Sequence, residues 1–581
     1  MTPLKRLARY FAAYRPKLIF GVSCILLMNI AKLKAPAVLG NAVDELKANG
    51  ASSSTLLQYG GMLILISLVQ GVFLFLQRRT LINMSRDIEY DLRNDFYAHL
   101  QRLPLEFYKS HRTGDLMARA TNDLAAVRMV VGPALMYSMN TVFATALIIP
   151  LMAGISWRLT LLAFVSMPLV AGATHFFSKR IHDRFERVQE NFGAVSSCAQ
   201  ESLAGVRVIR AYAQEKAEIE SFKNVNREFV NTNMRLIKLS AVFHPILQFF
   251  IGLGFIAVLW YGGSLAINGV ITTGEFFKFT LYLGYLVWPM IALGWVINLF
   301  QRSMASMGRI NAILSIGPAI RGSERPADIE RIKGEIEFRG LSFSYSGAIE
   351  PALKNIDLRI LPGQTVAFVG AVGAGKTTLM NLVPRLLDAP PGQVLIDGVP
   401  IGEVPLKLLR SSIGYVPQET FLFSDSVASN IGFGVISPSP EEVEQAAREA
   451  GIAEDIGEFP RKYDTLVGER GITLSGGQKQ RTAIARALIR RPPVLILDDA
   501  LSSVDTYTEE KILGHLRDVM KDRTSLIVSH RISTVKDADL IVVLDDGRIA
   551  ERGDHEELIA RGGLYAELYE KQLLEEELAA S

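Results

Sequence analysis

The sequence is poor in cysteine and nearly balanced in charge. Of its two cysteines, Cys24 lies in an apolar stretch and Cys198 in a charged one, so we expect no disulfide. The formal net charge of +3 leaves no basic surplus for nucleic acid, and we expect no such partner. No small-residue cleavage site follows the basic N-terminal stretch, which argues against a cleaved signal peptide.

Apolar residues, in contrast, are abundant. They make up 49% of the 581 residues, and the mean hydropathy is +0.23. Six apolar segments come before Gln301, each close to the 20 or so residues that cross a hydrocarbon core. They are Lys17–Leu39, Leu56–Leu76, Val131–Ile155, Leu159–Phe177, Ala241–Ile267 and Glu275–Phe300. The first part of the chain is therefore predicted to be a six-helix membrane domain.

The connections between these segments fall into two groups by their number of basic residues. The connection Arg78–Arg128 carries nine lysines and arginines and Lys179–Lys238 carries eleven, whereas the other three connections carry one or none. Positive charge stays on the cytoplasmic side, so both termini and both long connections are predicted to be cytoplasmic. We expect long cytoplasmic extensions of the spans, such as one helix over Leu56–Leu103, about 70 Å long.

Three lysines, Lys32, Lys34 and Lys278, fall within or at the outer parts of the spans. We expect their side chains to extend toward the outer interface. The alternative is a cavity that receives an anionic or amphipathic substrate. Aromatic residues at helical spacing (Tyr282, Tyr285, Trp288 and Trp295) suit such a cavity and equally suit helix packing.

Composition changes at the polar, Gly- and Pro-containing stretch around 316–334. We predict a membrane domain over residues 1–318, a linker over 319–335 and a nucleotide-binding domain over 336–581. In the last part, short apolar runs alternate with helical stretches, which is typical of an α/β domain with a largely parallel sheet.

The segment Gly370–Thr377 (GAVGAGKT) fits the phosphate-binding P-loop pattern. Glycines let its backbone N–H groups approach phosphate oxygens, the lysine reaches the β- and γ-phosphates, and the threonine hydroxyl suits Mg²⁺. A strand over Gln364–Val369 and a helix over Thr378–Arg385 are predicted on either side. The predicted nucleotide-binding residues here are Gly370, Ala371, Val372, Gly373, Ala374, Gly375, Lys376, Thr377 and Thr378.

Acidic residues follow another buried strand, in Val494–Asp499 (VLILDD). Asp498 is placed to hold Mg²⁺, and Asp499 stands where a base or water-orienting carboxylate is needed. Gln418, after a further strand-like run, could contact Mg²⁺ or the attacking water. The predicted metal site therefore comprises Thr377, Gln418 and Asp498, and the predicted catalytic residues are Asp499, Gln418 and His530, which follows the strand Ser525–Val528.

Two further elements complete the predicted nucleotide site. Leu474–Gln478 (LSGGQ) opens a helical run, where Ser475, Gly476, Gly477 and Gln478 suit a γ-phosphate at a helix N-terminus. Tyr345, ahead of the P-loop, suits stacking on an adenine ring. The expected ligands are therefore ATP and Mg²⁺.

Taken together, these motifs resemble an ABC-transporter ATPase. Tyr345, the P-loop, Gln418, LSGGQ, LILDD, Ser502–Asp505 (SSVD) and His530 occur in that family's order and spacing. With six spans ahead of them, the chain looks like an exporter half-transporter of the multidrug and lipid-flippase type. The segments Arg112–Asp123 and Gly205–Gln214 resemble the connections that press coupling helices onto the ATPase.

The resemblance implies that the chain hydrolyses ATP and exports a small amphipathic compound or a lipid across a bacterial cytoplasmic (inner) membrane. It also implies a second half-transporter, because each ATP lies between the P-loop of one ATPase domain and the LSGGQ of the other. Less favoured alternatives are a siderophore importer on the same fold and an ATP-gated channel or regulator.

One residue departs from the family pattern. The position after the Mg²⁺ aspartate is usually glutamate, and here it is Asp499. Its carboxylate should fall about 1 Å or more short of the attacking water, and such a misplacement can cost around a hundredfold in rate. This looks like the impaired, MdlA-like half of a heterodimeric exporter. A heterodimer is therefore favoured, and a homodimer such as a lipid A flippase remains the alternative.

Overall fold

The computed structural model describes residues 2–50, 52–323, 325–468, 471, 473–500 and 506–580. The chain divides into two compact units. The first contains residues 1–101 and 111–316, and the second contains residues 102–110 and 317–581. Each unit is described by itself.

The first unit is entirely helical. Among the described residues, six helical stretches are long and apolar enough to cross a membrane, and the six predicted spans are confirmed. The helices are α1 (Pro3–Ala13), α2 (Arg15–Asn49), α3 (Ser53–Leu100), α5 (Thr113–Ala118), α6 (Leu124–Met129), α7 (Leu135–Ile155), α8 (Trp157–Ala204), α9 (Val206–Ala211), α10 (Glu215–Ile267) and α11 (Thr273–Leu314), with π-helical turns η1 (Arg119–Asp123) and η2 (Val130–Ala134) joining α5, α6 and α7 into one run.

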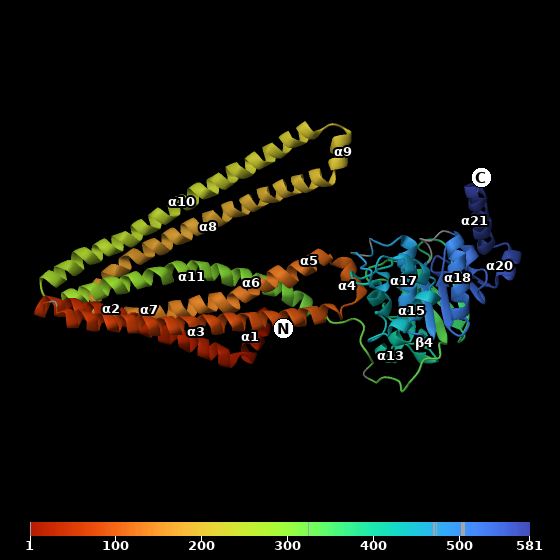
Figure 1. The fold of residues 1–581 in the computed structure, drawn as a ribbon, viewed down its shortest axis with the longest axis horizontal. Helices are drawn as coiled ribbons and strands as arrows, with labels where there is room; N and C mark the ends of the chain where they lie inside the picture. The colour runs from red at the N-terminus through yellow and green to blue at the C-terminus, as the bar shows by residue number, and fades with distance from the viewer. Residues whose placement is uncertain are drawn as a thin grey trace. The chain divides into compact units, whose positions relative to one another are not determined.

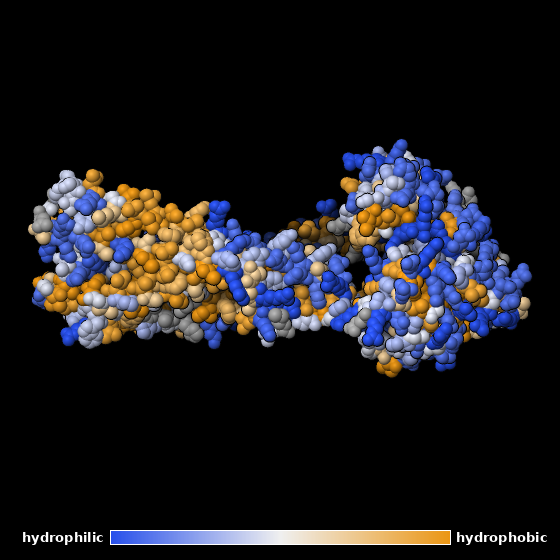
Figure 2. Space-filling view, turned by 90° about the horizontal axis from the view of Figure 1, so that it is seen from below, coloured by the Kyte–Doolittle hydropathy of each residue, from blue (hydrophilic) through white to orange (hydrophobic). Residues whose placement is uncertain are grey.

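The helix α3 illustrates how a span is formed. It covers 48 residues, about 70 Å, and begins three residues earlier and ends three residues earlier than the predicted helix over 56–103. None of its most apolar window is buried inside the chain. An apolar helix surface that the protein leaves uncovered suits lipid, where every backbone polar group is bonded within the helix. Figure 2 shows apolar residues gathered over one part of the helical unit, bordered by polar ones.

The helices α8 and α10 form a long antiparallel pair that α9 joins at its tip (Figure 1). Ion pairs hold other extensions together. The buried carboxylate of Glu89 on α3 pairs with Arg93 at 2.7 Å and with Arg128 on α6 at 3.3 Å. Asp123 accepts a 2.9 Å hydrogen bond from Arg309 on α11.

The second unit is built on two sheets. The strands are β1 (Ile336–Phe343), β2 (Leu353–Ile360), β3 (Thr365–Val369), β4 (Val394–Ile396), β5 (Val399–Pro400), β6 (Ile413–Val416), β7 (Val494–Asp498), β8 (Thr524–Val528), β9 (Leu540–Asp545) and β10 (Arg548–Gly553). The larger sheet has the order β10-β9-β3-β8-β7-β6 and is parallel except at β10, so the predicted α/β fold is confirmed. The carboxyl ends of β3, β6, β7 and β8 therefore meet at one edge, where ligands bind in such sheets.

The smaller sheet, β2-β1-β4-β5, is antiparallel, and the alternation of apolar runs did not predict it. Helices pack around both sheets: α12 (Lys376–Leu382), α13 (Leu406–Ser411), α14 (Val427–Gly432), α15 (Pro440–Glu449), α16 (Ala453–Glu458), α17 (Gly476–Leu488), α18 (Thr506–Met520), α19 (Ile532–Val535), α20 (His555–Arg561), α21 (Leu564–Ala580) and the 3-10 turn η3 (Lys462–Asp464). The P-loop helix α12 thus begins at Lys376, two residues before the predicted start.

A short helix from the first long cytoplasmic connection also belongs to the second unit. This helix, α4 (Leu105–Ser110), precedes the segment Arg112–Asp123 that the sequence singled out, and that segment lies in the first unit. The Ser346 hydroxyl donates a 3.1 Å hydrogen bond to Glu106 on α4. The second unit therefore includes α4 from the first long connection, and the expectation for Arg112–Asp123 stays a prediction.

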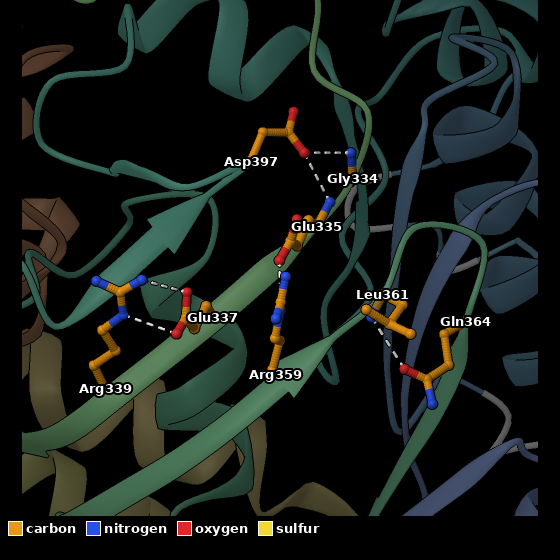
Figure 3. Close-up of polar contacts among 8 residues, drawn as sticks. All are labelled: Gly334, Glu335, Glu337, Arg339, Arg359, Leu361, Gln364 and Asp397. Atoms are coloured by element: carbon orange, nitrogen blue, oxygen red, sulfur yellow. Dashed lines mark hydrogen bonds and ion pairs between the residues drawn. The ribbon is translucent and has the colours of Figure 1, made fainter.

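The turn after β4 anchors the chain that enters the second unit. The carboxylate of Asp397 accepts backbone hydrogen bonds from Lys333 at 2.6 Å, Gly334 at 3.1 Å and Glu335 at 2.9 Å. Figure 3 shows this carboxylate facing the start of β1, beside the ion pairs Glu335–Arg359 and Glu337–Arg339. Asp397 itself has a left-handed backbone with φ of +51°.

We predict that Asp397→Gly destabilises the second unit by about 1–3 kcal/mol, because three backbone donors lose their acceptor. Glycine is the informative replacement because it keeps the positive φ without strain. The melting temperature of the second unit should fall by a few degrees in Asp397→Gly, at roughly 2–4 °C per kcal/mol for a unit of this size. Asp397→Asn, which retains an oxygen acceptor, is the matched control, and it should lose less stability than Asp397→Gly. Equal melting of Asp397→Gly and the wild type would show that the anchor contributes nothing.

Candidate functional site

The loop between β3 and α12 can be formed only with glycine at two positions. Gly370 has φ of +140°, and a Cβ there would collide with the carbonyl oxygen of Leu544 on β9. Gly375 has φ of +97°, and its Cβ would lie 2.8 Å from the carbonyl oxygen of Ala352. Both positions exclude a side chain by conformation and by space. The loop is thereby held tightly around the end of β3, a conformation in which backbone N–H groups can bind phosphate.

The ammonium group of Lys376 lies inside this loop. Its Nζ donates to the carbonyl oxygens of Gly370 at 2.7 Å and Ala371 at 2.8 Å, and the residue is only 6% exposed. Burial lowers the pKa of Lys376, and the carboxylates of Asp499 and Asp498 oppose that shift. A desolvated ammonium group in such a loop is stabilised strongly by a bound phosphate group, because the anion replaces the lost solvation. The geometry therefore suits the predicted contact with the β- and γ-phosphates.

Asp498, at the end of β7, fits a divalent cation. It is fully buried, Thr377 donates to its Oδ1 at 3.1 Å, and its Oδ2 has no hydrogen-bond partner among the described residues. Burial raises the pKa of Asp498 to about 6; the Thr377 hydroxyl lowers it, the Asp499 carboxylate raises it, and Lys376 lowers it. An orphaned, buried carboxylate oxygen beside a hydroxyl is a donor set that Mg²⁺ accepts. Thr377 and Asp498 are thus the residues that would hold it.

Asp499 follows directly and lies next to the third predicted ligand. The Gln418 side chain, beyond β6, donates to its Oδ2 at 3.3 Å, and the Asp499 backbone N–H donates to the Val528 carbonyl at 2.9 Å. Asp499 has a left-handed backbone with φ of +52°. Gln418 is exposed, so its amide can also turn toward a ligand. The structure thus joins Gln418 to Asp499, and Thr377 to Asp498, in two adjacent pairs at the edge formed by β3, β6 and β7.

Tyr345 is positioned by α12 on one side and by α4 on the other. Its hydroxyl is 3.0 Å from the Thr378 hydroxyl, and the Lys109 ammonium of α4 lies 5.0 Å from its ring centroid. Tyr345 and Lys109 border a cavity of about 250 Å³, together with Leu105, Glu106, Tyr108, Asn381 and Leu387. The cavity supplies space for a flat ring beside Tyr345. The contribution of α4 was not foreseen from the sequence, because the pairing joins residues more than 200 positions apart.

The LSGGQ residues form a separate group at the N-terminus of α17, a helix of 13 residues. The Ser475 hydroxyl accepts from the Gln478 backbone at 3.2 Å, and the Gln478 side chain accepts from the Ser475 backbone at 3.1 Å, which makes a capping box. The Gln478 amide also donates to Asp455 at 3.1 Å, and Arg481 pairs with the same carboxylate. Ser475 and Gly476 are exposed and Gly477 is half-buried, so this end of the helix faces outward.

His530 follows strand β8, away from the LSGGQ group in the sequence. His530 is exposed after β8, and its carbonyl oxygen accepts a hydrogen bond from the Gln572 side chain of α21. Because β8 is parallel to β3 and β7, His530 follows the same edge of the sheet as the P-loop and Asp498. Ser502–Asp505 lies outside the described residues.

Comparison with known proteins agrees with this geometry. Residues 18–290 match the family model "ABC transporter transmembrane region", and residues 353–502 match "ABC transporter". The chain is 38% identical over 572 residues to the probable multidrug resistance ABC transporter ATP-binding/permease protein YheI of Bacillus subtilis, covering 98% of each chain. It is 35% identical over 571 residues to the multidrug resistance-like ATP-binding protein MdlA of Escherichia coli, covering 98% of this chain and 96% of the other.

Two further similarities bear on substrate and fold. The chain is 35% identical over 579 residues to the ATP-dependent lipid A-core flippase of Syntrophus aciditrophicus, covering 100% of this chain and 96% of the other. The solved structure of a bacterial Atm1-family ABC exporter with ATP bound superposes with a TM-score of 0.79, at 28% identity, covering 97% of this chain and 99% of that one.

We predict that metal binding at Asp498 weakens as pH falls through about 6, because the metal requires the ionised carboxylate. The sign follows from the raised pKa: at pH 5.5 most of the buried carboxyl is protonated, whereas at pH 7.5 it is almost fully ionised. Mn²⁺, a paramagnetic substitute for Mg²⁺, can be titrated with a non-hydrolysable ATP analogue bound. Its apparent affinity should be about fourfold lower at pH 5.5.

The nucleotide analogue also takes up protons near this pH, so the same titration of the free analogue is the reference. The Asp498→Asn chain is the matched control, because its amide does not titrate. Its metal affinity should be low at pH 5.5 and at pH 7.5. A pH dependence no larger than that of the free analogue would contradict the role of Asp498.

Proposed function

Because the chain belongs to the ABC exporters, as a half-transporter with one transmembrane region and one ABC ATPase, we propose that it exports an amphipathic small molecule or lipid as half of a heterodimer. ATP-driven ABC export is the activity of this multidrug and lipid-flippase-like group, and the chain is a multi-pass membrane protein of that bacterial family. In the proposed heterodimer, the ATP site on this chain's own P-loop is the weaker one.

The exposed N-terminus of α17 is the observation that supports a second subunit most strongly. Ser475 and Gln478 complete their hydrogen bonds with each other and with Asp455, and the free end of the helix faces outward. A 13-residue helix with an exposed N-terminus attracts an anion. In the proposed assembly, this end closes onto the γ-phosphate of an ATP bound to the partner's P-loop, and the partner's equivalent closes onto Lys376.

The chain's own P-loop residues would bind and orient the nucleotide. Phosphate oxygens replace the carbonyl oxygens of Gly370 and Ala371 as acceptors for the Lys376 ammonium. Tyr345 stacks on the adenine, and Thr377 and Asp498 hold the divalent cation. When bound, Mg²⁺ would neutralise negative charge on the phosphate groups.

The weakness of this site would arise at Asp499. The carboxylate is one methylene shorter than the glutamate expected there, and Gln418 already donates to it at 3.3 Å. Correct placement of a water-orienting carboxylate within about 1 Å matters strongly for rate. The binding residues around it are intact. The site is therefore proposed to bind ATP well and to hydrolyse it slowly.

The tip of the α8–α10 pair offers a second contact for the partner. The helix α9 has no buried residue, and its neighbour Tyr212 is 74% exposed. An apolar side chain at the cytoplasmic end of such a hairpin is in water unless another surface covers it. We propose that the partner's ATPase domain covers Tyr212, so that closure of the nucleotide sites moves α8 and α10.

We predict that substitutions in the two half-sites affect the heterodimer unequally. Asp499→Asn should change steady-state phosphate release by less than about twofold, because its own site contributes little. Ser475→Arg should lower it by more than about tenfold, because bulk and positive charge enter the partner's competent site. Both are measured on purified complexes with equal subunit content. If the chain alone forms a dimer with vigorous ATPase activity that Asp499→Asn abolishes, Asp499 is a working catalytic residue and the heterodimer proposal is wrong.

A separate prediction concerns Tyr212. Tyr212→Ala should reduce transport of a fluorescent amphiphile several-fold while ATP hydrolysis continues, because the contact that transmits closure is lost. Tyr97 on α3, with a similar exposed fraction, provides the control, and Tyr97→Ala should leave both activities unchanged. Transport and hydrolysis are measured on the same reconstituted sample. Undiminished transport by Tyr212→Ala would contradict the proposed contact.

A further inference from the structure

The membrane spans contain several lysines, and the one acidic residue within their predicted bounds is Glu275, the first residue of the last span. Between residues 17 and 39 and between residues 276 and 300, the sequence has Lys32, Lys34 and Lys278 besides Lys17 and no aspartate or glutamate. The other four apolar segments also lack acids. A cation inside the hydrocarbon region is costly unless something anionic or polar compensates it, and such residues commonly mark a functional site.

Counted along α2, Lys32 lies between two polar contacts that mark the inner and outer ends of the span. Toward the cytoplasm, Lys17 on the same helix pairs with Asp87 at 2.6 Å. Toward the outside, Asp44 on α2 accepts hydrogen bonds from the first residues of α11, at 2.6 Å from both the Thr272 hydroxyl and the Gly274 N–H. Along the helix, Lys32 is 15 residues from Lys17, which is about 22 Å, and 12 residues from Asp44, which is about 18 Å. Its side chain is too short to reach either surface of a core about 30 Å thick.

The structure directs the Lys32 ammonium to α11 instead. Its Nζ lies 4.3 Å from the ring centroid of Tyr285, and both residues are only partly buried. The neighbouring Tyr282 is buried and its hydroxyl donates to the Leu33 carbonyl at 3.2 Å, which fixes the α2–α11 contact. Among the described residues no carboxylate pairs with Lys32, and no hydrogen bond is formed by the Tyr285 hydroxyl. An aromatic face compensates a cation only in part.

The other two lysines have different surroundings. The side chain of Lys278 lies along Gly40 and close to the Gly274 backbone, near the outer end of α11, where extension to the interface is straightforward. Lys34 is exposed, two residues beyond Lys32 and therefore about 200° around the helix. Lys32 alone of the three is held against an aromatic ring.

We propose that Lys32 and Tyr285 form a recognition site for the anionic group of an acidic amphiphile, such as a carboxylate, sulfonate or phosphate attached to an apolar body. This inference rests on the proposed export function and specifies its substrate class. The anion supplies the charge that the spans lack, and the Tyr285 ring keeps the ammonium in place while the site is unfilled. The hydroxyl of Tyr285 is available as a second donor to the same anion.

The test uses two fluorescent probes that differ in one charge: 11-(dansylamino)undecanoate and its uncharged carboxamide. Binding to the assembled two-subunit transporter in lipid nanodiscs is measured by dansyl fluorescence, with empty nanodiscs subtracted. The wild type should bind the acid about tenfold more tightly than the amide, as expected for a hydrogen bond to a charged group. Lys32→Gln should bring the two affinities within about twofold, and Lys32→Arg should keep the preference.

Lys34→Gln is the matched control, because it removes a charge from the same helix at nearly the same depth. It should leave the preference unchanged. Tyr285→Phe should retain most of it, since the ring remains. The inference is overturned if the wild type shows no preference for the acid, if Lys32→Gln keeps it, or if Lys34→Gln abolishes it.

Failure of this inference is distinguishable from failure of the proposed function. If neutral and acidic probes bind equally and both stimulate ATP hydrolysis, the chain handles amphiphiles but Lys32 does not select their charge. If neither probe binds or stimulates hydrolysis, export of amphiphiles itself is contradicted.

Discussion

The nucleotide site depends on a carboxylate that the fold buries without satisfying. Asp498 ends the buried strand β7, where Thr377 donates to one of its oxygens and the other oxygen has no partner among the described residues. Such a group costs a few kcal/mol of folding free energy unless a cation reaches it. The close fit of Gly370 under Leu544 and the start of α12 at Lys376 place the P-loop beside this carboxylate.

Sequence reasoning succeeded where chemistry alone dictates residue type. A phosphate cradle requires glycine, lysine and a hydroxyl in a fixed order, and the strands that carry Asp498 and Gln418 are short apolar runs that end in polar residues. The six spans could also be predicted from the sequence, because lipid requires long uninterrupted apolar helices. The pairs Thr377–Asp498 and Gln418–Asp499 then follow from the parallel order of β3, β7 and β6.

Long-range packing was beyond sequence reasoning. The helix α4, which belongs to the second unit although it lies in the first long connection, was not expected, because local sequence patterns do not state which turn of a long connection packs with a distant sheet. The antiparallel sheet anchored by Asp397 depends on the pairing of β1 with β4, which lie about 50 residues apart in the chain. Lys32 appeared to be one of three equivalent lysines, and only the position of Tyr285 on another helix distinguishes it.

The left-handed backbone of Asp499 bears on how this chain could evolve. Aspartate and asparagine enter that conformation more readily than longer side chains, for which it costs about 1–2 kcal/mol. At this position, then, a longer carboxylate side chain would reach further but would also raise the conformational cost of the left-handed backbone. In a transporter whose partner performs hydrolysis, mutation to aspartate gains stability without loss of fitness, and reversion must first pass through a less stable protein. Division of labour between two subunits would thus become difficult to undo.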